Sequence, residues 1–185
     1  MKLLALSGSL RAASINSALL RAAARLAPSG IEVEVFGAMG ELSLFNPDRE
    51  SDPPLPVVRL RRAVDAADAL LIASPEYAHG VSGVMKNALD WLVSFAPFAG
   101  KPVAVINASP RAAHADTALK ETLRTMSAVL VDEACVAIPL LGAGLDEQGM
   151  VDAEAVAAPI QRALEALCRE AARRRPLDDA TFPLG

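Results

Sequence analysis

The stretch ALLIASPEYAHG, residues 69–80, joins an unbroken apolar run to a loop of different chemistry. Five consecutive apolar residues, Ala69–Ala73, are typical of a strand covered on both faces, as in a parallel sheet flanked by helices. In the loop, Pro75 stiffens the exit from the strand, Gly80 permits close backbone approach, and Tyr77 offers a flat face with a polar tip. The stretch therefore predicts a buried strand whose loop can receive the edge and face of a planar ring.

Other apolar runs alternate with helical patterns on both sides of this strand. Strands are predicted at Lys2–Leu6, Ile31–Phe36, Ala69–Ala73, Pro102–Ile106 and Val129–Ile138. Helices are predicted at Ser17–Ala27, Val57–Asp65, Gly83–Phe95, Thr117–Ala128 and from Asp152 to about Arg173. Gly37–Pro56 is polar and rich in proline, which predicts a long surface loop. Strands that alternate with helices, without an internal repeat, predict a doubly wound, five-stranded parallel α/β sheet with right-handed crossovers.

The length and composition fit one domain. At 185 residues the chain suits a single core, so residues 1–175 are expected to form one domain and residues 176–185 a peripheral tail. Aromatic residues make up only 4% of the chain, so Ala, Leu and Val must build the core, which favours helices packed closely on a sheet. The net charge of −4 argues against a general nucleic-acid binder.

Two features bear on location in the cell. No apolar run approaches the ~18 residues that span a bilayer, and the apolar part of MKLLALSGS is too short for a signal peptide. Cys135 and Cys168 lie far apart and lack the spacing of a metal site. We therefore expect no membrane contact, no bound metal, and two inert thiols in a reducing cytoplasm.

The loop SGSLRAAS, residues 7–14, follows the first strand and carries more hydrogen-bonding groups than a simple turn needs. Gly8 and its serine neighbours let the backbone pass close to a ligand, and Ser14 can cap the next helix, with Asn16 just behind. Free amides at a helix start suit an anion, and the guanidinium of Arg11 fits phosphate oxygens. The alternative is an ordinary helix cap with a solvated arginine.

Other phosphate-binding loops are excluded by what this loop lacks. It has no lysine for a Walker motif, only Gly8 for a dinucleotide fingerprint, and no cysteine nucleophile of a phosphatase. The loop therefore suits holding a phosphate rather than cleaving one. Two further loops with unusual chemistry leave strand ends, SPEYAHG and NASPRAAH. Because parallel sheets bind ligands at the carboxyl ends of their strands, one site built from all three loops is expected.

Several side chains admit two interpretations. Glu76 could be a catalytic acid, but a lone exposed carboxylate is more often just solvated, and His79 is more often a rim residue than a proton shuttle. Asn87, Asp90 and Trp91 share one helix face. They indicate helix packing, but the only tryptophan of the chain beside Asp90 also suggests a subunit contact, and we expect Trp91 at or near an interface.

Two motifs, GSLRAASINSALL (8–20) and SPEYAHGVSGVMKNALDW (74–91), closely resemble the NAD(P)H-dependent FMN reductase family, which includes bacterial quinone, azo-dye and chromate reductases. The resemblance implies a flavodoxin-like fold with strand order 2-1-3-4-5, bound FMN, and a homodimer or homotetramer. It implies that the FMN phosphate is held by Ser9, Arg11, Ser14 and Asn16. It implies that the isoalloxazine ring is lined by Pro75, Glu76, Tyr77, Gly80 and, through its backbone N–H, Ala78.

The sequence departs from the family pattern in three places. Ala78 replaces the asparagine of the usual PEYN, and Ser82 replaces the proline before Gly83. The third loop, which often carries glycines near the pyrimidine side of the flavin, reads NASPRAAHAD, so only Ser109 and Arg111 can be proposed there.

The activity that the resemblance implies is hydride transfer from NADPH or NADH to FMN, followed by electron delivery to a quinone or similar small acceptor. No side chain need act as acid or base, because the flavin carries the chemistry and backbone donors of Glu76–Gly80 would stabilise charge on the reduced ring. The alternatives are release of reduced FMN to a partner monooxygenase, a flavodoxin-like electron carrier or FMN-binding module, and an oligomeric scaffold without turnover. Basic residues near the strand ends, His79, Lys86 and Arg111, argue weakly against a carrier, which usually presents an acidic surface.

Overall fold

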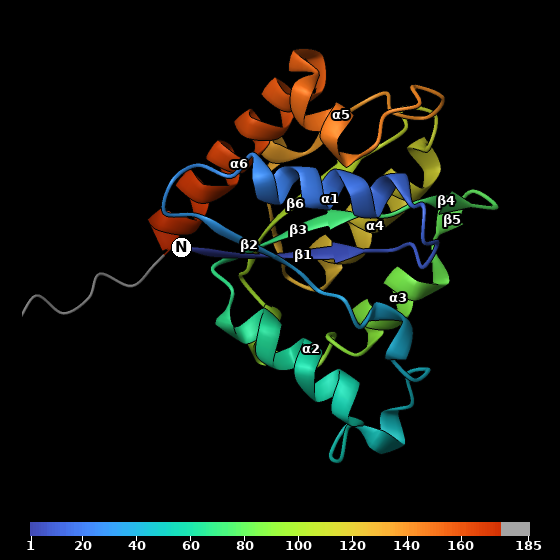
Figure 1. Ribbon diagram of the computed structural model, residues 1–185. Helices are drawn as coiled ribbons and strands as arrows, with labels where there is room; N and C mark the ends of the chain where they lie inside the picture. The colour runs from blue at the N-terminus through green and yellow to red at the C-terminus, as the bar shows by residue number, and fades with distance from the viewer. Residues whose placement is uncertain (175–185) are drawn as a thin grey trace, which may run out of the picture.

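A computed structural model describes residues 1–174 of the chain, with a parallel sheet between two layers of helices (Figure 1). The strands are β1 (Lys2–Ser7), β2 (Glu32–Val35), β3 (Ala69–Ala73), β6 (Pro102–Asn107), β7 (Val129–Leu130) and β8 (Val136–Ala137). Their order is β2-β1-β3-β6-β7, all neighbours are parallel, and β8 also pairs with β6. Since β7 and β8 occupy the predicted fifth strand, the doubly wound order 2-1-3-4-5 is confirmed.

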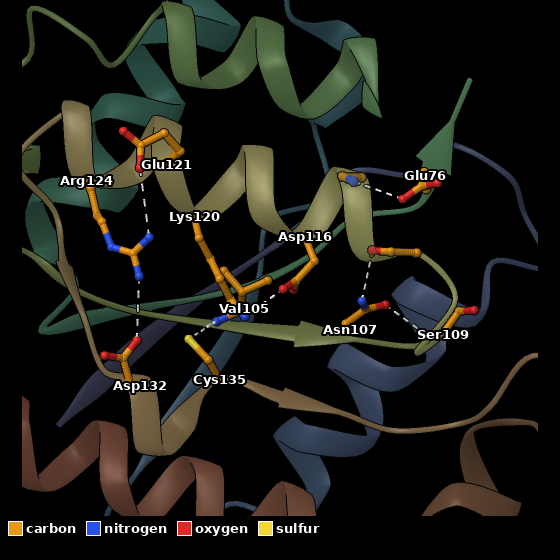
Figure 2. Close-up of polar contacts among 12 residues, drawn as sticks. Glu76, Val105, Asn107, Ser109, Asp116, Lys120, Glu121, Arg124, Asp132 and Cys135 are labelled. Atoms are coloured by element: carbon orange, nitrogen blue, oxygen red, sulfur yellow. Dashed lines mark hydrogen bonds and ion pairs between the residues drawn. The ribbon is translucent and has the colours of Figure 1, made fainter. Parts of the chain in front are cut away.

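The fifth strand is divided, which the sequence did not indicate. Strand β7 pairs with the start of β6 and β8 with its end, while the 3-10 turn η4 (Asp132–Ala134) leaves the sheet between them. In the gap the Val105 N–H donates to Cys135 Sγ at 3.4 Å (Figure 2). The thiol thus takes the place of a strand carbonyl at the edge of β6, which gives Cys135 a structural role.

The two faces of the sheet carry separate apolar clusters because side chains alternate along each strand. Leu3 and Ala5 of β1 face the layer of α1 (Ile15–Arg25), α5 (Glu147–Asp152) and α6 (Glu154–Arg174). Leu4 and Leu6 face the layer of α2 (Leu55–Ala66), α3 (Gly83–Asp90) and α4 (Ala113–Thr125). Alanine and leucine dominate the first cluster; leucine is the commonest residue of the second, followed by valine, and the second also holds Phe36, Trp91 and Phe98.

Several element boundaries differ from the sequence-based expectation. Helix α1 begins two residues and α4 four residues earlier than predicted, α3 ends at Asp90 and is followed by the 3-10 turn η3 (Ala96–Phe98), and the last predicted helix is preceded by α5. A two-stranded hairpin, β4 (Glu76–Tyr77) and β5 (Gly80–Val81), was not predicted. The expected surface loop after β2 contains the 3-10 turns η1 (Met39–Glu41) and η2 (Pro47–Arg49). It also buries Met39 and Leu42, so it is partly a core segment.

Trp91 lies in the core of its own chain, so its side chain cannot make a subunit contact, and the expectation of an interface near it stays a prediction. Its side chain is fully buried, its Nε1–H donates to the Ser43 carbonyl at 2.8 Å, and its ring meets Phe45 edge-on at 5.1 Å between centroids. Asn87 Oδ1 accepts from the Phe45 N–H at 2.8 Å. Asn87 and Trp91 therefore fasten the loop between β2 and α2, which is the helix-packing interpretation.

The remaining expectations about the chain as a whole concern its tail and the membrane. The predicted peripheral tail, residues 176–185, lies outside the described residues. Among the helices of residues 1–174, none combines the length and apolar character that crossing a membrane requires.

Candidate functional site

The loops after β1, β3 and β6 enclose one cleft at the carboxyl ends of the strands. Its volume, about 380 Å³, lies in the range of small-molecule pockets. The predicted site residues that line it are Ser9, Arg11, Ser14, Asn16, Pro75, Glu76, Tyr77 and Ser109, together with Arg111. Ala78 and Gly80 lie in the hairpin and are not among the lining residues. The structure thus brings the three loops together, as expected, but leaves two proposed residues outside the cleft.

Gly8 anchors the first loop to the second. This close contact, rather than space for a ligand, explains why the position needs a residue without a side chain. Its N–H donates to the Ala73 carbonyl at 2.8 Å and its carbonyl accepts from Ser82 Oγ at 2.7 Å. A Cβ at Gly8 would lie 2.3 Å from Ser74 Oγ and 2.7 Å from Ser82 Oγ. The expectation that Gly8 makes room for a ligand is therefore replaced by a close contact between the two loops.

Ser14 and Asn16 form the base of the first wall. Ser14 Oγ accepts from the Ser17 N–H at 3.2 Å, which caps α1 and explains why the helix begins earlier than predicted. Asn16 is buried, and its Oδ1 is the one buried side-chain oxygen or nitrogen of residues 1–174 that lacks a hydrogen-bond partner. Because an unsatisfied buried polar atom is destabilising, Asn16 indicates a bound group that hydrogen-bonds there.

Two guanidinium groups at the cleft have no partner in the described chain. Arg11 and Arg111 line the cleft, are exposed, and form no ion pair or hydrogen bond within residues 1–174. Arg11 lies beside the first turn of α1, whose amides have no acceptor inside the helix. The first wall can therefore bind an anion through a charged side chain and helix amides together.

The second wall is the hairpin, whose two-residue turn has positive φ at both positions. Ala78 has φ 49° and His79 has φ 59°, as a type I′ turn requires, although neither is one of the asparagine, aspartate or glycine residues usual there. Tyr77 is 60% exposed at the cleft. The hairpin thus presents a flat aromatic face on a strained turn.

Glu76 is not the solvated carboxylate that its sequence context suggests. Its side chain is only 14% exposed and accepts from the Ala115 N–H at 2.9 Å (Figure 2). It also lies 3.2 Å from His79 Nδ1. The hydrogen bond from Ala115 is the main cause that lowers the pKa of Glu76, with smaller effects of His114 and His79. His79 is exposed and is not among the residues that line the cleft, and its ring packs edge-on against His114 at 4.5 Å between centroids.

The third wall depends on Asn107, which the sequence reasoning missed. The side chain is buried at the end of β6; its Oδ1 accepts from the Ser109 N–H at 2.9 Å and its Nδ2 donates to the Ala112 carbonyl at 3.2 Å (Figure 2). An asparagine directly after a buried strand and before Ser-Pro was the signal available. Leu141, which also lines the cleft, follows β8 and has no comparable local signal.

Neither metal nor thiol chemistry is supported by the described residues. Within residues 1–174 no three His, Cys, Asp or Glu side chains are grouped so that they could hold a metal ion. Cys135 and Cys168 are free and partly buried, and burial raises the pKa of both thiols. Arg11, Asn16 and Tyr77 instead suit a ligand that combines an anion, a hydrogen-bonding linker and a planar ring.

Comparisons with known proteins agree with this description. The NADPH-dependent FMN reductase family matches residues 1–141, which contain every residue that lines the cleft. An NAD(P)H-dependent FMN reductase of Pseudomonas aeruginosa is 38% identical over 174 residues, 90% of this chain and 93% of the relative. A quinone reductase of Pseudomonas putida is 36% identical over 141 residues, 71% and 72% of the two chains. The solved structure of a flavoenzyme NAD(P)H:acceptor oxidoreductase from Paracoccus denitrificans superimposes with a TM-score of 0.77 at 29% identity, covering 93% and 97% of the chains.

Proposed function

The chain belongs to the NADPH-dependent FMN reductase family, and on this premise we propose that it binds FMN in the cleft and passes electrons from NAD(P)H through the flavin to a quinone or similar small acceptor. The observation that carries the proposal is the first wall. There the unpaired guanidinium of Arg11 lies beside the start of α1, and the buried Asn16 Oδ1 has no partner. When bound, FMN supplies the hydride- and electron-transfer chemistry.

The residues of the cleft fit the parts of FMN. Arg11 and the first-turn amides of α1 would hold the phosphate, with Ser9 and Ser14 beside them. Asn16 can offer its oxygen to a ribityl hydroxyl or its nitrogen to the phosphate, since an asparagine amide can adopt either orientation. One molecule with an anionic end and a hydroxylated chain would satisfy both groups.

The other two walls would enclose the ring. Pro75 and Tyr77 supply an apolar surface on one side, and Ser109, held by Asn107, supplies a polar group on the other. Glu76 has a lowered pKa and already accepts a hydrogen bond, so at neutral pH it is ionised and does not donate a proton. The chain's contribution is therefore to bind and orient the flavin.

Arg11→Leu separates phosphate binding from general support of the fold. A charge-assisted contact contributes about 1.5–3 kcal/mol, so FMN affinity should fall by about 10- to 150-fold while riboflavin, which lacks the phosphate, keeps its affinity. The measurement is a pair of fluorescence-quenching titrations at two salt concentrations. The preference of the wild type for FMN should shrink as salt rises, and shrink less in the variant.

Arg59→Leu, an exposed arginine of α2 without an ion pair in residues 1–174, is the matched control and should change neither affinity. Equal losses of FMN and riboflavin in Arg11→Leu would show that Arg11 only supports the fold. Turnover is tested separately, because NAD(P)H oxidation that accelerates with menadione separates a reductase from an electron carrier.

We also propose a homodimer or homotetramer in the cytoplasm. Exposed apolar side chains, Leu44 in the loop fastened to α3 and Val93 just after that helix, support association through this side of the molecule. The two free thiols support a reducing compartment. Light scattering tests the oligomeric state, and fractionation of the cells tests the location.

A further inference from the structure

The hairpin β4–β5 is attached to the rest of the molecule by side chains. It forms a two-stranded sheet of its own and does not pair with the central sheet. Ser82, which follows it, binds the Gly8 carbonyl and so fixes one end of the hairpin. The free part, Tyr77 to Gly80, extends beyond that anchor, so its position depends on what holds it on the side of α4.

Glu76 provides this attachment. Its Oε2 accepts from the amide of Ala115, the third residue of α4 (Figure 2). Its Oε1 lies 3.2 Å from His79 Nδ1. The N-cap position of α4 holds Ala112, whose methyl group cannot cap a helix. A carboxylate from a segment far away in the sequence therefore takes the place of the local cap, where the positive end of the helix favours negative charge.

His79 adds a second contact to the same helix. Its ring packs edge-on against His114, the second residue of α4, and these are the only two histidines of the chain. His79 has a positive φ, and its contacts with Glu76 and His114 help to hold the strained turn. We call Glu76, His79, His114 and Ala115 the clasp.

We propose that Glu76 is a positioning residue: through the clasp it sets the separation between the cleft wall that carries Tyr77 and the wall that follows β6. Glu76 itself lines the cleft, but its carboxylate binds an amide and an imidazole that are not among the cleft-lining groups. The proposal rests on the proposed function in one respect: FMN is taken to be the ligand whose affinity depends on this separation. The attachment itself does not depend on flavin.

Three substitutions of Glu76 distinguish positioning from acid–base chemistry. Glu76→Gln keeps an oxygen at the right reach to accept from Ala115, whereas Glu76→Ala removes it and Glu76→Asp keeps the charge but withdraws it by one methylene. We expect FMN affinity within about threefold of wild type for Gln and about tenfold weaker for Ala and Asp. An acid–base role predicts the opposite pattern: Gln and Ala lose turnover together, with FMN affinity unchanged.

The matched control is Glu170→Ala at the far end of α6. Glu170 is also a partly buried carboxylate with a lowered pKa, held by Arg174, but it lies away from the cleft. It should leave FMN affinity unchanged. If the FMN affinity of Glu170→Ala fell as much as that of Glu76→Ala, the loss would reflect general destabilisation, and the proposal would be wrong.

Amide hydrogen exchange of the flavin-free protein tests the clasp without reference to function. Glu76 is the acceptor for the Ala115 amide, so exchange at Ala115 and at the hairpin should accelerate at least tenfold in Glu76→Ala and Glu76→Asp but not in Glu76→Gln. Unchanged exchange in both weakened variants would overturn the proposal. If the wild type bound no FMN but the variants showed this exchange pattern, the proposed function would be refuted, while the proposed role of the clasp would still hold.

Discussion

At the scale of single residues, Asn16 combines burial with an unsatisfied oxygen, which is unfavourable unless a ligand completes it. Asn16→Leu has nearly the same shape and removes the unpaired group. We expect the free energy of unfolding of the flavin-free protein to rise by roughly 1 kcal/mol, while FMN and riboflavin both bind more weakly. Urea denaturation and fluorescence titration measure the two effects. A variant that is less stable and binds flavin normally would show that Asn16 serves the fold.

Gly8 provides a steric prediction at the same scale. An added Cβ would overlap Ser74 Oγ and Ser82 Oγ, so Gly8→Ala should lower the free energy of unfolding by about 1–3 kcal/mol and displace the loop after β1. Gly83→Ala is the control, because a Cβ there has no atom within 4 Å and alanine favours the helix. That variant should be as stable as wild type or slightly more so. Equal stability of both variants in urea would contradict the packing described for Gly8.

Residue chemistry could be read from the sequence where it depends on near neighbours. The Ser14 cap and the anion-binding character of Arg11 follow from a strand, a loop and a helix start in one short stretch. The roles of Glu76 and Asn107 do not, because the amide that Glu76 caps is 39 residues away and Asn107 acts on a loop whose path is set by the fold. An isolated carboxylate in a sequence resembles a solvated one until its distant partner is known.

At the scale of elements, the hairpin turn is strained for its residues. Ala78 has φ 49° in a position that asparagine tolerates better, and its side chain does not line the cleft. Ala78→Asn should therefore raise the free energy of unfolding by about 0.5–1 kcal/mol and leave FMN affinity unchanged. Ala78→Val places a branched side chain in the same conformation and should lower the free energy of unfolding. Chemical denaturation that ranks the variants in the opposite order would rule out the turn geometry.

The elements that the sequence predicts well are those determined by their own residues. The run Ala69–Ala73 is apolar throughout, and the structure places a strand over the same residues. The break between β7 and β8 was missed because it depends on η4 leaving the sheet and on the Cys135 thiol bonding to β6. The early start of α4 was missed for a related reason, since its first turn is completed by Glu76 of the hairpin.

At the scale of the whole molecule, the parallel sheet explains why three loops could be predicted to form one site. Strands that run in one direction bring their carboxyl ends to one edge, so any chemistry after β1, β3 and β6 converges there. No comparable rule predicts from the sequence which surface of a chain associates with another chain. A direct subunit contact by Trp91 could not be distinguished from core packing in the sequence, because a buried tryptophan and an interface tryptophan have the same sequence pattern.

The burial of Trp91 makes a sharper test of association available. Leu44 is 84% exposed between two residues that contact Trp91, and Val93, two residues after Trp91, is 59% exposed, so Leu44→Glu with Val93→Glu should place charge in an interface without disturbing the core. We expect wild type to scatter light as a dimer or tetramer at micromolar concentration and the double variant as a monomer that still binds FMN. Since Trp91 is enclosed by its own chain, its fluorescence should stay unchanged on dissociation and shift to the red only on unfolding. A double variant that remains associated would exclude this face as the interface, and a monomeric wild type with FMN bound would exclude association altogether.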